Sequence, residues 1–111
     1  MKTGKMIWPN IETINDVVIA IEKAEGEFYT ILVCLTLLRR MFTVTNREEY
    51  SIADLLKNTK LDEALNAVLE LEAKDRDSIR KETLWVLLNM TYCCATNKDI
   101  EDLMRKIFKV D

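Results

Sequence analysis

The sequence predicts an all-α fold, and three observations support this prediction. Apolar residues recur every three or four positions along most of the chain, which is the period of an amphipathic helix. No segment alternates apolar and polar residues as a half-buried strand does. The chain of 111 residues has only two glycines and one proline, and 49% of its residues are hydrophobic. At this length we expect one packed domain over residues 1–111.

Three helices are expected in the first half of the chain. Asn10 can cap a helix that runs to about residue 25, and Gly26 breaks the pattern. A second, almost wholly apolar helix follows over about residues 27–44. A Thr-Asn-Arg-Glu cap then begins a short helix over about residues 47–58. The apolar face of the first helix consists of Ile14, Val17, Val18 and Ile21.

Three more helices are expected in the second half. One covers about residues 61–73 and ends at a charged turn, and Ser78 opens the next, which continues through Cys94. A Thr-Asn-Lys-Asp cap at Thr96 begins the last helix. The apolar residues of that last helix are Ile100, Leu103, Met104, Ile107 and Phe108.

The two halves share one order of elements: an amphipathic helix, a break, a long buried helix, a cap and a short helix. The caps at Thr45 and Thr96 lie 51 residues apart. Apolar positions of the first and fourth expected helices also match at a distance of 50 residues. A period of this size predicts a helical repeat, with repeat one over about residues 11–58 and repeat two over about residues 61–109.

From Arg80 to Thr91 the chain reads Arg-Lys-Glu-Thr-Leu-Trp-Val-Leu-Leu-Asn-Met-Thr. This stretch, within residues 79–91, resembles the third helix of an armadillo repeat, especially the importin-alpha form Arg-Lys-Glu-x-x-Trp-x-x-Ser-Asn-Ile-Thr. Leu88 replaces the serine of that pattern. The resemblance implies an armadillo/HEAT-like fold of about two repeats and six helices, stacked as a short right-handed superhelical segment.

The resemblance also implies a peptide-binding site on this helix. In that family the tryptophan packs on basic side chains of an extended peptide, and the asparagine amide binds the peptide backbone. Trp85 and Asn89 lie one helical turn apart, with Lys81 a turn before them and Cys93 a turn after. These four residues are the candidate site for a basic peptide, which implies a role as a nuclear-transport adaptor. Alternatively, Trp85 is a core residue and Asn89 lies at the core margin.

A second hypothesis assigns the chain to structural or assembly subunits. A repeat stack normally needs about three repeats to cover its apolar faces, and this chain has about two. We therefore expect a homodimer, or permanent docking on a larger protein, through an apolar end helix. The candidate self-association residues are Leu103, Met104, Ile107 and Phe108.

The composition argues against an enzyme. The chain has no histidine, which removes the commonest general base near neutral pH and the usual catalytic zinc ligand. Its glycines, Gly4 and Gly26, form no phosphate-binding loop. We therefore expect a binding protein without enzymatic activity, cofactor or metal.

Charge and cysteine usage indicate the class of partner and the compartment. A net charge of −3 argues against direct binding to nucleic acid or to an anionic membrane. Arg39 and Arg40 end the long apolar helix, where they can favour its dipole or pair with carboxylates of a neighbouring helix. Alternatively, they bind a partner. Cys34, Cys93 and Cys94 have neither metal-ligand spacing nor an even disulfide framework. We therefore expect a reduced protein of the cytoplasm, the nucleus or both.

Overall fold

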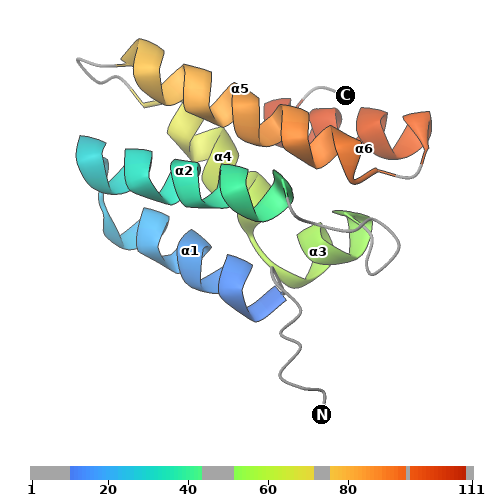
Figure 1. Ribbon diagram of the computed structural model, residues 1–111, viewed down its shortest axis with the longest axis horizontal. Coiled ribbons are helices and arrows are strands. Elements are labelled where there is room, and N and C mark those ends of the chain that lie inside the picture. Colours follow the sequence, from blue (N-terminus) through green and yellow to red (C-terminus); the bar gives the residue numbers. More distant parts are fainter. Residues whose placement is uncertain (1–10, 44–51, 72–75, 95, 110–111) are drawn as a thin grey trace.

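The computed structural model describes residues 11–43, 52–71, 76–94 and 96–109, and this part of the chain forms six α-helices and no strand (Figure 1). The predicted all-α fold is therefore confirmed. The helices are α1 (Ile11–Lys23), α2 (Phe28–Thr43), α3 (Ile52–Asn58), α4 (Leu61–Leu69), α5 (Arg76–Tyr92) and α6 (Asn97–Phe108). None of these helices is both long and apolar enough to cross a lipid bilayer.

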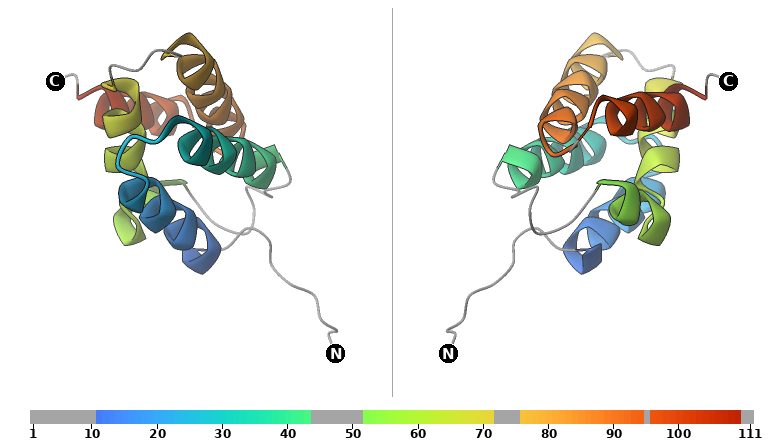
Figure 2. Two further views of the ribbon diagram at one scale, coloured as in Figure 1. Left: turned by 90° about the vertical axis from the view of Figure 1, so that its left-hand side faces the viewer. Right: turned by 90° about the vertical axis from the view of Figure 1, so that its right-hand side faces the viewer.

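The two longest helices, α2 and α5, lie side by side and run in the same direction (Figure 1). They form the most extensive helix pair in the described part of the molecule. α1 packs against α2 and α4, α4 packs against α5 and α6, and α3 packs against α6. The two side views show α4 and α6 on one side of the α2–α5 layer (Figure 2). No described helix covers the opposite side of the α2–α5 layer.

One continuous apolar core joins all six helices. Leu35 and Leu38 of α2, Leu65 of α4 and Val86 of α5 have no exposed surface. Buried residues recur at spacings of three and four positions in each helix, so each helix turns one apolar face inward. The apolar face expected for the first helix is confirmed, because all four of its residues are buried.

A tight turn joins α1 to α2. Gly26 has a φ of +83°, a left-handed conformation that costs glycine little. The carboxylate of Glu27 then accepts hydrogen bonds from the backbone N–H groups of Tyr29 (3.3 Å) and Thr30 (2.7 Å), which begin α2. Hydrogen bonds from the side chain and backbone of Thr30 hold the pKa of the Glu27 carboxyl below its ordinary value. The break predicted at Gly26 is therefore confirmed.

Several helix ends differ from the sequence prediction. α4 ends at Leu69 rather than near residue 73, because the Glu70 N–H bonds to the carbonyls of Asn66 and Ala67 in a closing turn. α5 begins at Arg76, so Ser78 lies inside the helix rather than at its start. Such ends depend on local closing turns that apolar periodicity does not specify.

The cap of the last helix is confirmed, because the Thr96 hydroxyl accepts a hydrogen bond from the Asp99 N–H at 3.1 Å. The caps predicted at Asn10 and Thr45 lie outside the described residues.

The burial pattern of α2 predicts the outcome of two neighbouring substitutions. Leu38→Ala should lower the free energy of unfolding by about 2–5 kcal/mol, because Leu38 is fully buried and its loss leaves a cavity. Leu37→Ala should cost less than about 1 kcal/mol, because Leu37 is 38% exposed. Urea denaturation of both variants measures the difference. Equal losses would contradict the assigned core face.

Candidate functional site

Large side chains are exposed in two matching stripes on α2 and α5. Tyr29, Val33 and Arg40 form the stripe on α2, and Lys81, Trp85 and Tyr92 form the stripe on α5. In both stripes the residues are spaced by four and then seven positions, which keeps them on one side of a helix. We call these six residues the front face.

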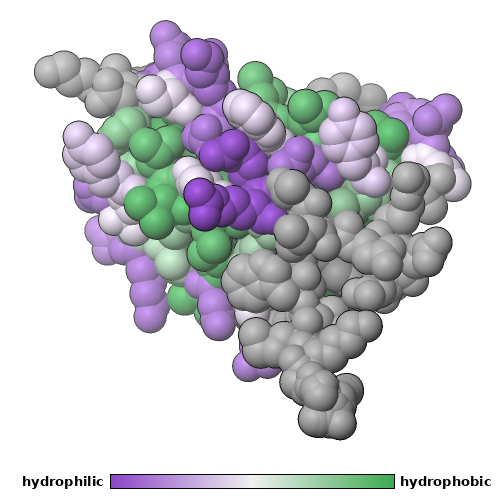
Figure 3. All heavy atoms as spheres, in the orientation of Figure 1, coloured by the Kyte–Doolittle hydropathy of each residue, from purple (hydrophilic) through white to green (hydrophobic). Residues whose placement is uncertain are grey.

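The front face is unusually apolar for exposed surface. Tyr29 is 72% exposed, Val33 66%, Trp85 51% and Tyr92 69%. In the space-filling view, apolar side chains surround a strongly hydrophilic group over α2 and α5 (Figure 3). Aromatic side chains next to arginine are enriched at protein interfaces, where they supply most of the binding energy.

Arg39 of α2 connects to three residues of α5. Its guanidinium carbon lies 4.7 Å from the ring centroid of Trp85, in a cation–π contact. Its Nε forms an ion pair with Oε1 of Glu82 at 3.1 Å, and the Thr36 hydroxyl lies 3.4 Å from the same oxygen. The Arg39 carbonyl accepts a hydrogen bond from the Asn89 amide at 3.0 Å. The predicted pairing of this arginine with a carboxylate on a neighbouring helix is therefore confirmed.

Asn89 and Cys93 point toward α2. The Asn89 amide bonds to the Arg39 carbonyl, and the Cys93 thiol lies 3.8 Å from the Phe42 carbonyl in the last turn of α2. Both contacts are made to backbone oxygens near the end of α2, and a carbonyl oxygen can accept two hydrogen bonds. Both side chains thus join α2 to α5.

The four predicted peptide-binding residues therefore have different surroundings. Lys81 is exposed, Trp85 is half exposed, Asn89 is partly buried and Cys93 is buried. The exposed ring of Trp85 shows that its interpretation as a core residue is wrong. The structure does not bring all four side chains to one open groove.

The predicted self-association residues of α6 also differ in exposure. Leu103 and Ile107 are buried, Met104 is partly buried against the core, and Phe108 is 43% exposed. The sequence predicted that the apolar face of this helix would be left uncovered. This is wrong for Leu103 and Ile107, because α3 and α4 pack against α6.

Phe108 lies at a groove of about 400 Å³ between α4, α5 and α6. Its other lining residues are Asn66, Leu69, Glu70, Arg80 and Leu84. At its edge the Asn66 amide donates a hydrogen bond to the Ile107 carbonyl at 2.7 Å, which satisfies the end of α6. The exposed apolar surface of α6 in the described part is thus the rim of this groove.

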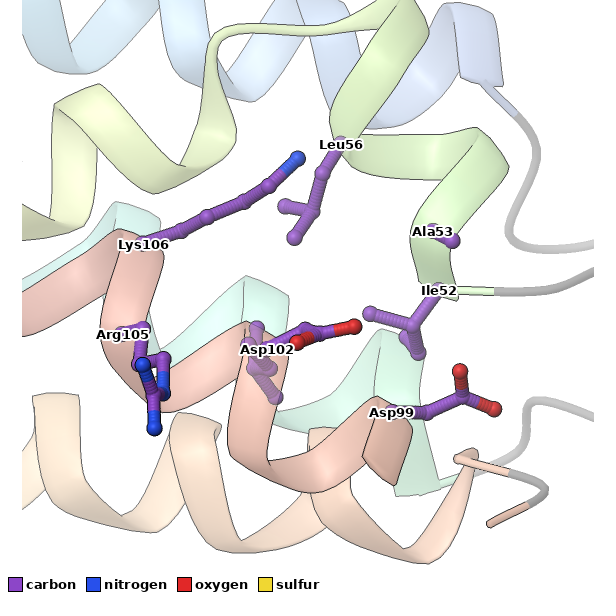
Figure 4. A pocket seen from close by; sticks show the side chains of 8 residues that line it. Ile52, Ala53, Leu56, Asp99, Asp102, Arg105 and Lys106 are labelled. Carbon is purple, nitrogen blue, oxygen red and sulfur yellow. The ribbon is translucent and has the colours of Figure 1, made fainter. Parts of the chain in front are cut away.

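A second hollow, of about 240 Å³, lies between α3 and α6 (Figure 4). Ile52 and Leu56 of α3 point into it, and Lys106 extends across it from α6. Two carboxylates, those of Asp99 and Asp102, line the hollow from the first turns of α6. Within the described residues, no three His, Cys, Asp or Glu side chains are placed to hold a metal ion.

All three cysteines are buried thiols. Burial raises the pKa of the Cys34 thiol, and burial with the nearby charges of Asp99 and Cys93 raises the pKa of Cys94 to about 11. A thiol with a raised pKa is a poor nucleophile, because the reactive form is the thiolate. The three cysteines therefore act as small buried side chains of the core.

Comparison with known proteins finds no family, no curated protein and no solved structure that matches this chain. The armadillo resemblance of residues 79–91 stays a prediction.

Sequence reasoning missed the outward side of α2. Tyr29 and Val33 belong to a long apolar run that reads as uniformly buried, yet both are exposed. Their positions match Lys81 and Trp85 of α5 at a shift of 52 residues, and this register was the signal that could have placed them on the surface.

The interhelical role of Asn89 can be tested by stability. Asn89→Ala should lower the free energy of unfolding by about 1 kcal/mol, because the substitution removes a partly buried hydrogen bond to α2. Asn58→Ala is a matched control, since the exposed Asn58 amide bonds within its own helix to the Asp54 carbonyl. Its loss should change stability by less than about 0.5 kcal/mol. Identical urea denaturation curves for wild type and Asn89→Ala would contradict the assigned contact.

The raised pKa of Cys94 predicts a pH effect on stability. The folded thiol holds its proton above the unfolded value of 9.0 and up to about 11. The folded state thus binds more protons than the unfolded state in this range, and stability falls as pH rises from about 9 to about 11. The melting temperature should drop over this range by less in Cys94→Ala than in the wild type. Parallel pH profiles of the two proteins would contradict the assignment.

Proposed function

We propose that this protein is a non-enzymatic, helical-repeat binding module that holds a segment of a partner protein on its front face. The observation that carries this proposal is the pair of matching exposed stripes, each with aromatic and basic residues. Leaving Tyr29, Val33, Trp85 and Tyr92 in water forfeits the free energy that their burial would release. A partner that covers them recovers it.

Helix packing supports a repeat architecture. α1 packs on α4, α2 on α5 and α3 on α6, so each helix of the first half contacts its counterpart in the second. The buried positions of α2 also reappear in α5 at a shift of 52 residues. In α2 these positions are Ile31, Cys34, Leu35, Leu38, Met41 and Phe42, and in α5 and the turn after it they are Thr83, Val86, Leu87, Met90, Cys93 and Cys94.

The contacts of Arg39 prepare the front face for binding. The guanidinium over the Trp85 ring, with its Glu82 ion pair, holds the indole in one orientation before any partner arrives. A side chain already fixed in its bound orientation loses less entropy on association. The partner therefore meets a preorganised aromatic surface.

The charges of this face favour an acidic partner segment. Arg40 and Lys81 are exposed among the apolar residues, and the Glu82 carboxylate is already paired with Arg39. A lysine or arginine of a basic peptide would compete with Arg39 for the Trp85 ring and would meet like charges. An extended segment with aromatic or aliphatic residues and nearby carboxylates complements the face better. The three buried thiols support a reducing compartment, cytoplasmic or nuclear.

Selection from a random peptide library displayed on phage tests this function, because it needs no identified partner. Peptides enriched on the wild-type protein should combine large apolar residues with Asp or Glu. Their affinity, from fluorescence anisotropy of labelled peptide, should fall at least about tenfold in Trp85→Ala, since exposed aromatic residues at the centre of an interface contribute most binding energy. Circular dichroism checks that the variant is folded.

Leu84→Ala is the matched control, because Leu84 precedes Trp85 on the same helix but lies off the front face. This variant should bind within about twofold of the wild type. Enrichment of Lys- and Arg-rich peptides that depend on Asn89 would instead support the basic-peptide groove of the armadillo resemblance and a transport role. The absence of any binder that depends on Trp85 would contradict the proposed function.

A further inference from the structure

Exposed residues also line two opposite edges of the α2–α5 layer. Leu84 and Leu88 form the outer edge of α5, and they are 54% and 51% exposed. Thr30 and Leu37 form the outer edge of α2, next to a shallow hollow lined by Tyr29, Thr30, Val33 and Cys34. These edges belong to the two ends of the stack. α1 flanks the α2 edge (Figure 1), where Thr30 and Leu37 remain exposed.

The outer edge of α5 corresponds to the inner edge of α2. Within the chain, Thr36 and Arg39 of α2 contact α5. A shift of 52 residues, which aligns the buried positions of the two helices, takes Thr36 to Leu88 and Leu32 to Leu84. The exposed side of α5 therefore corresponds to the side of α2 that packs against α5. This side is more apolar in α5 than in α2.

We propose that the outer edge of α5 binds the outer edge of α2 in a second copy of this chain. This contact between two copies has the same geometry as the α2–α5 contact within one copy. The copies therefore stack head to tail. This inference rests on the repeat architecture proposed above and not on the peptide-binding front face. In the repeated register, Leu88 meets Thr30 of the second copy.

Charge complementarity supports a second copy of the chain as the partner at the α5 edge. The same register places Arg76 and Arg80, at the start of α5, beside the acidic turn of the second copy that contains Glu25 and Glu27. α1 and that turn carry five carboxylates and one lysine among the described residues: Glu12, Asp16, Glu22, Lys23, Glu25 and Glu27. Asp77 also lies in the first turn of α5, so the two arginines leave a net charge of +1 there opposite the acidic turn, which favours a head-to-tail contact.

A symmetric contact through the front face is disfavoured. It would bring Arg40 and Lys81 of two copies together, and like charges facing each other in an interface oppose association. The head-to-tail contact joins two different surfaces, so each assembly keeps one open edge at either end and grows without closing. The groove of about 400 Å³ beside Leu84 adds Leu69 and Phe108 to the apolar surface of the α5 end.

Sedimentation velocity of the full chain from about 10 to about 300 µM tests this assembly. The wild type should form species larger than a dimer that shrink at high salt, because the contact pairs opposite charges. Leu88→Glu blocks the α5 edge and Leu37→Glu blocks the α2 edge, so each variant alone should be monomeric. An equimolar mixture should form a heterodimer, because each variant retains the edge that the other lacks.

Tyr92→Glu is the control on the front face and should assemble as the wild type does while losing peptide binding. Melting temperatures verify that every variant is folded. A wild type that stays monomeric at about 300 µM would overturn the proposal. So would undiminished assembly of either edge variant, or a mixture that stays monomeric. Peptide binding that depends on Trp85 would survive any of these results, so the two proposals fail separately.

Discussion

The packing of α2 against α5 is the constraint on which the rest of the structure depends. These helices share the largest contact among the described elements, and α1 and α4 pack on them. Arg39 concentrates the polar part of that contact, since its guanidinium reaches Glu82 and Trp85 and its carbonyl accepts from Asn89. A partly covered ion pair contributes little stability by itself, so the value of this cluster lies in fixing the register of two helices.

Most of the fold could be predicted from the sequence because helical periodicity is a local signal. The inward positions of α1 follow from a spacing of three and four residues, and the Thr96 cap from side-chain chemistry next to the chain. The end of α4 was predicted less well. Leu71 continues the apolar pattern beyond the point where the backbone closes its last turn, and periodicity cannot detect that turn.

The candidate site was less predictable, because its geometry depends on contacts between segments about 50 residues apart. Asn89 is polar and lies one turn from Trp85, so the sequence groups these two residues on one stripe. In the structure the neighbouring α2 backbone engages the asparagine, whereas the tryptophan remains half exposed. The apolar side chain of Val33 suggests a core position, yet Val33 is exposed. Its exposure follows from the way α2 packs against α5, which the sequence alone does not specify.

The front face and the stacking edge adjoin on α5, because Leu88 lies one helical turn from both Trp85 and Tyr92. Consecutive helical residues differ by about 100°, so Leu84 points away from the side on which Trp85 lies. A second copy centred on Leu84 would therefore leave the Trp85 ring open, and Leu88 would mark the border between the two surfaces. In such a stack each copy would add another Tyr29 stripe and another Trp85 stripe along one line. A long partner segment could engage several stripes at once, and its overall affinity would exceed that of any single stripe because later contacts form at high effective concentration.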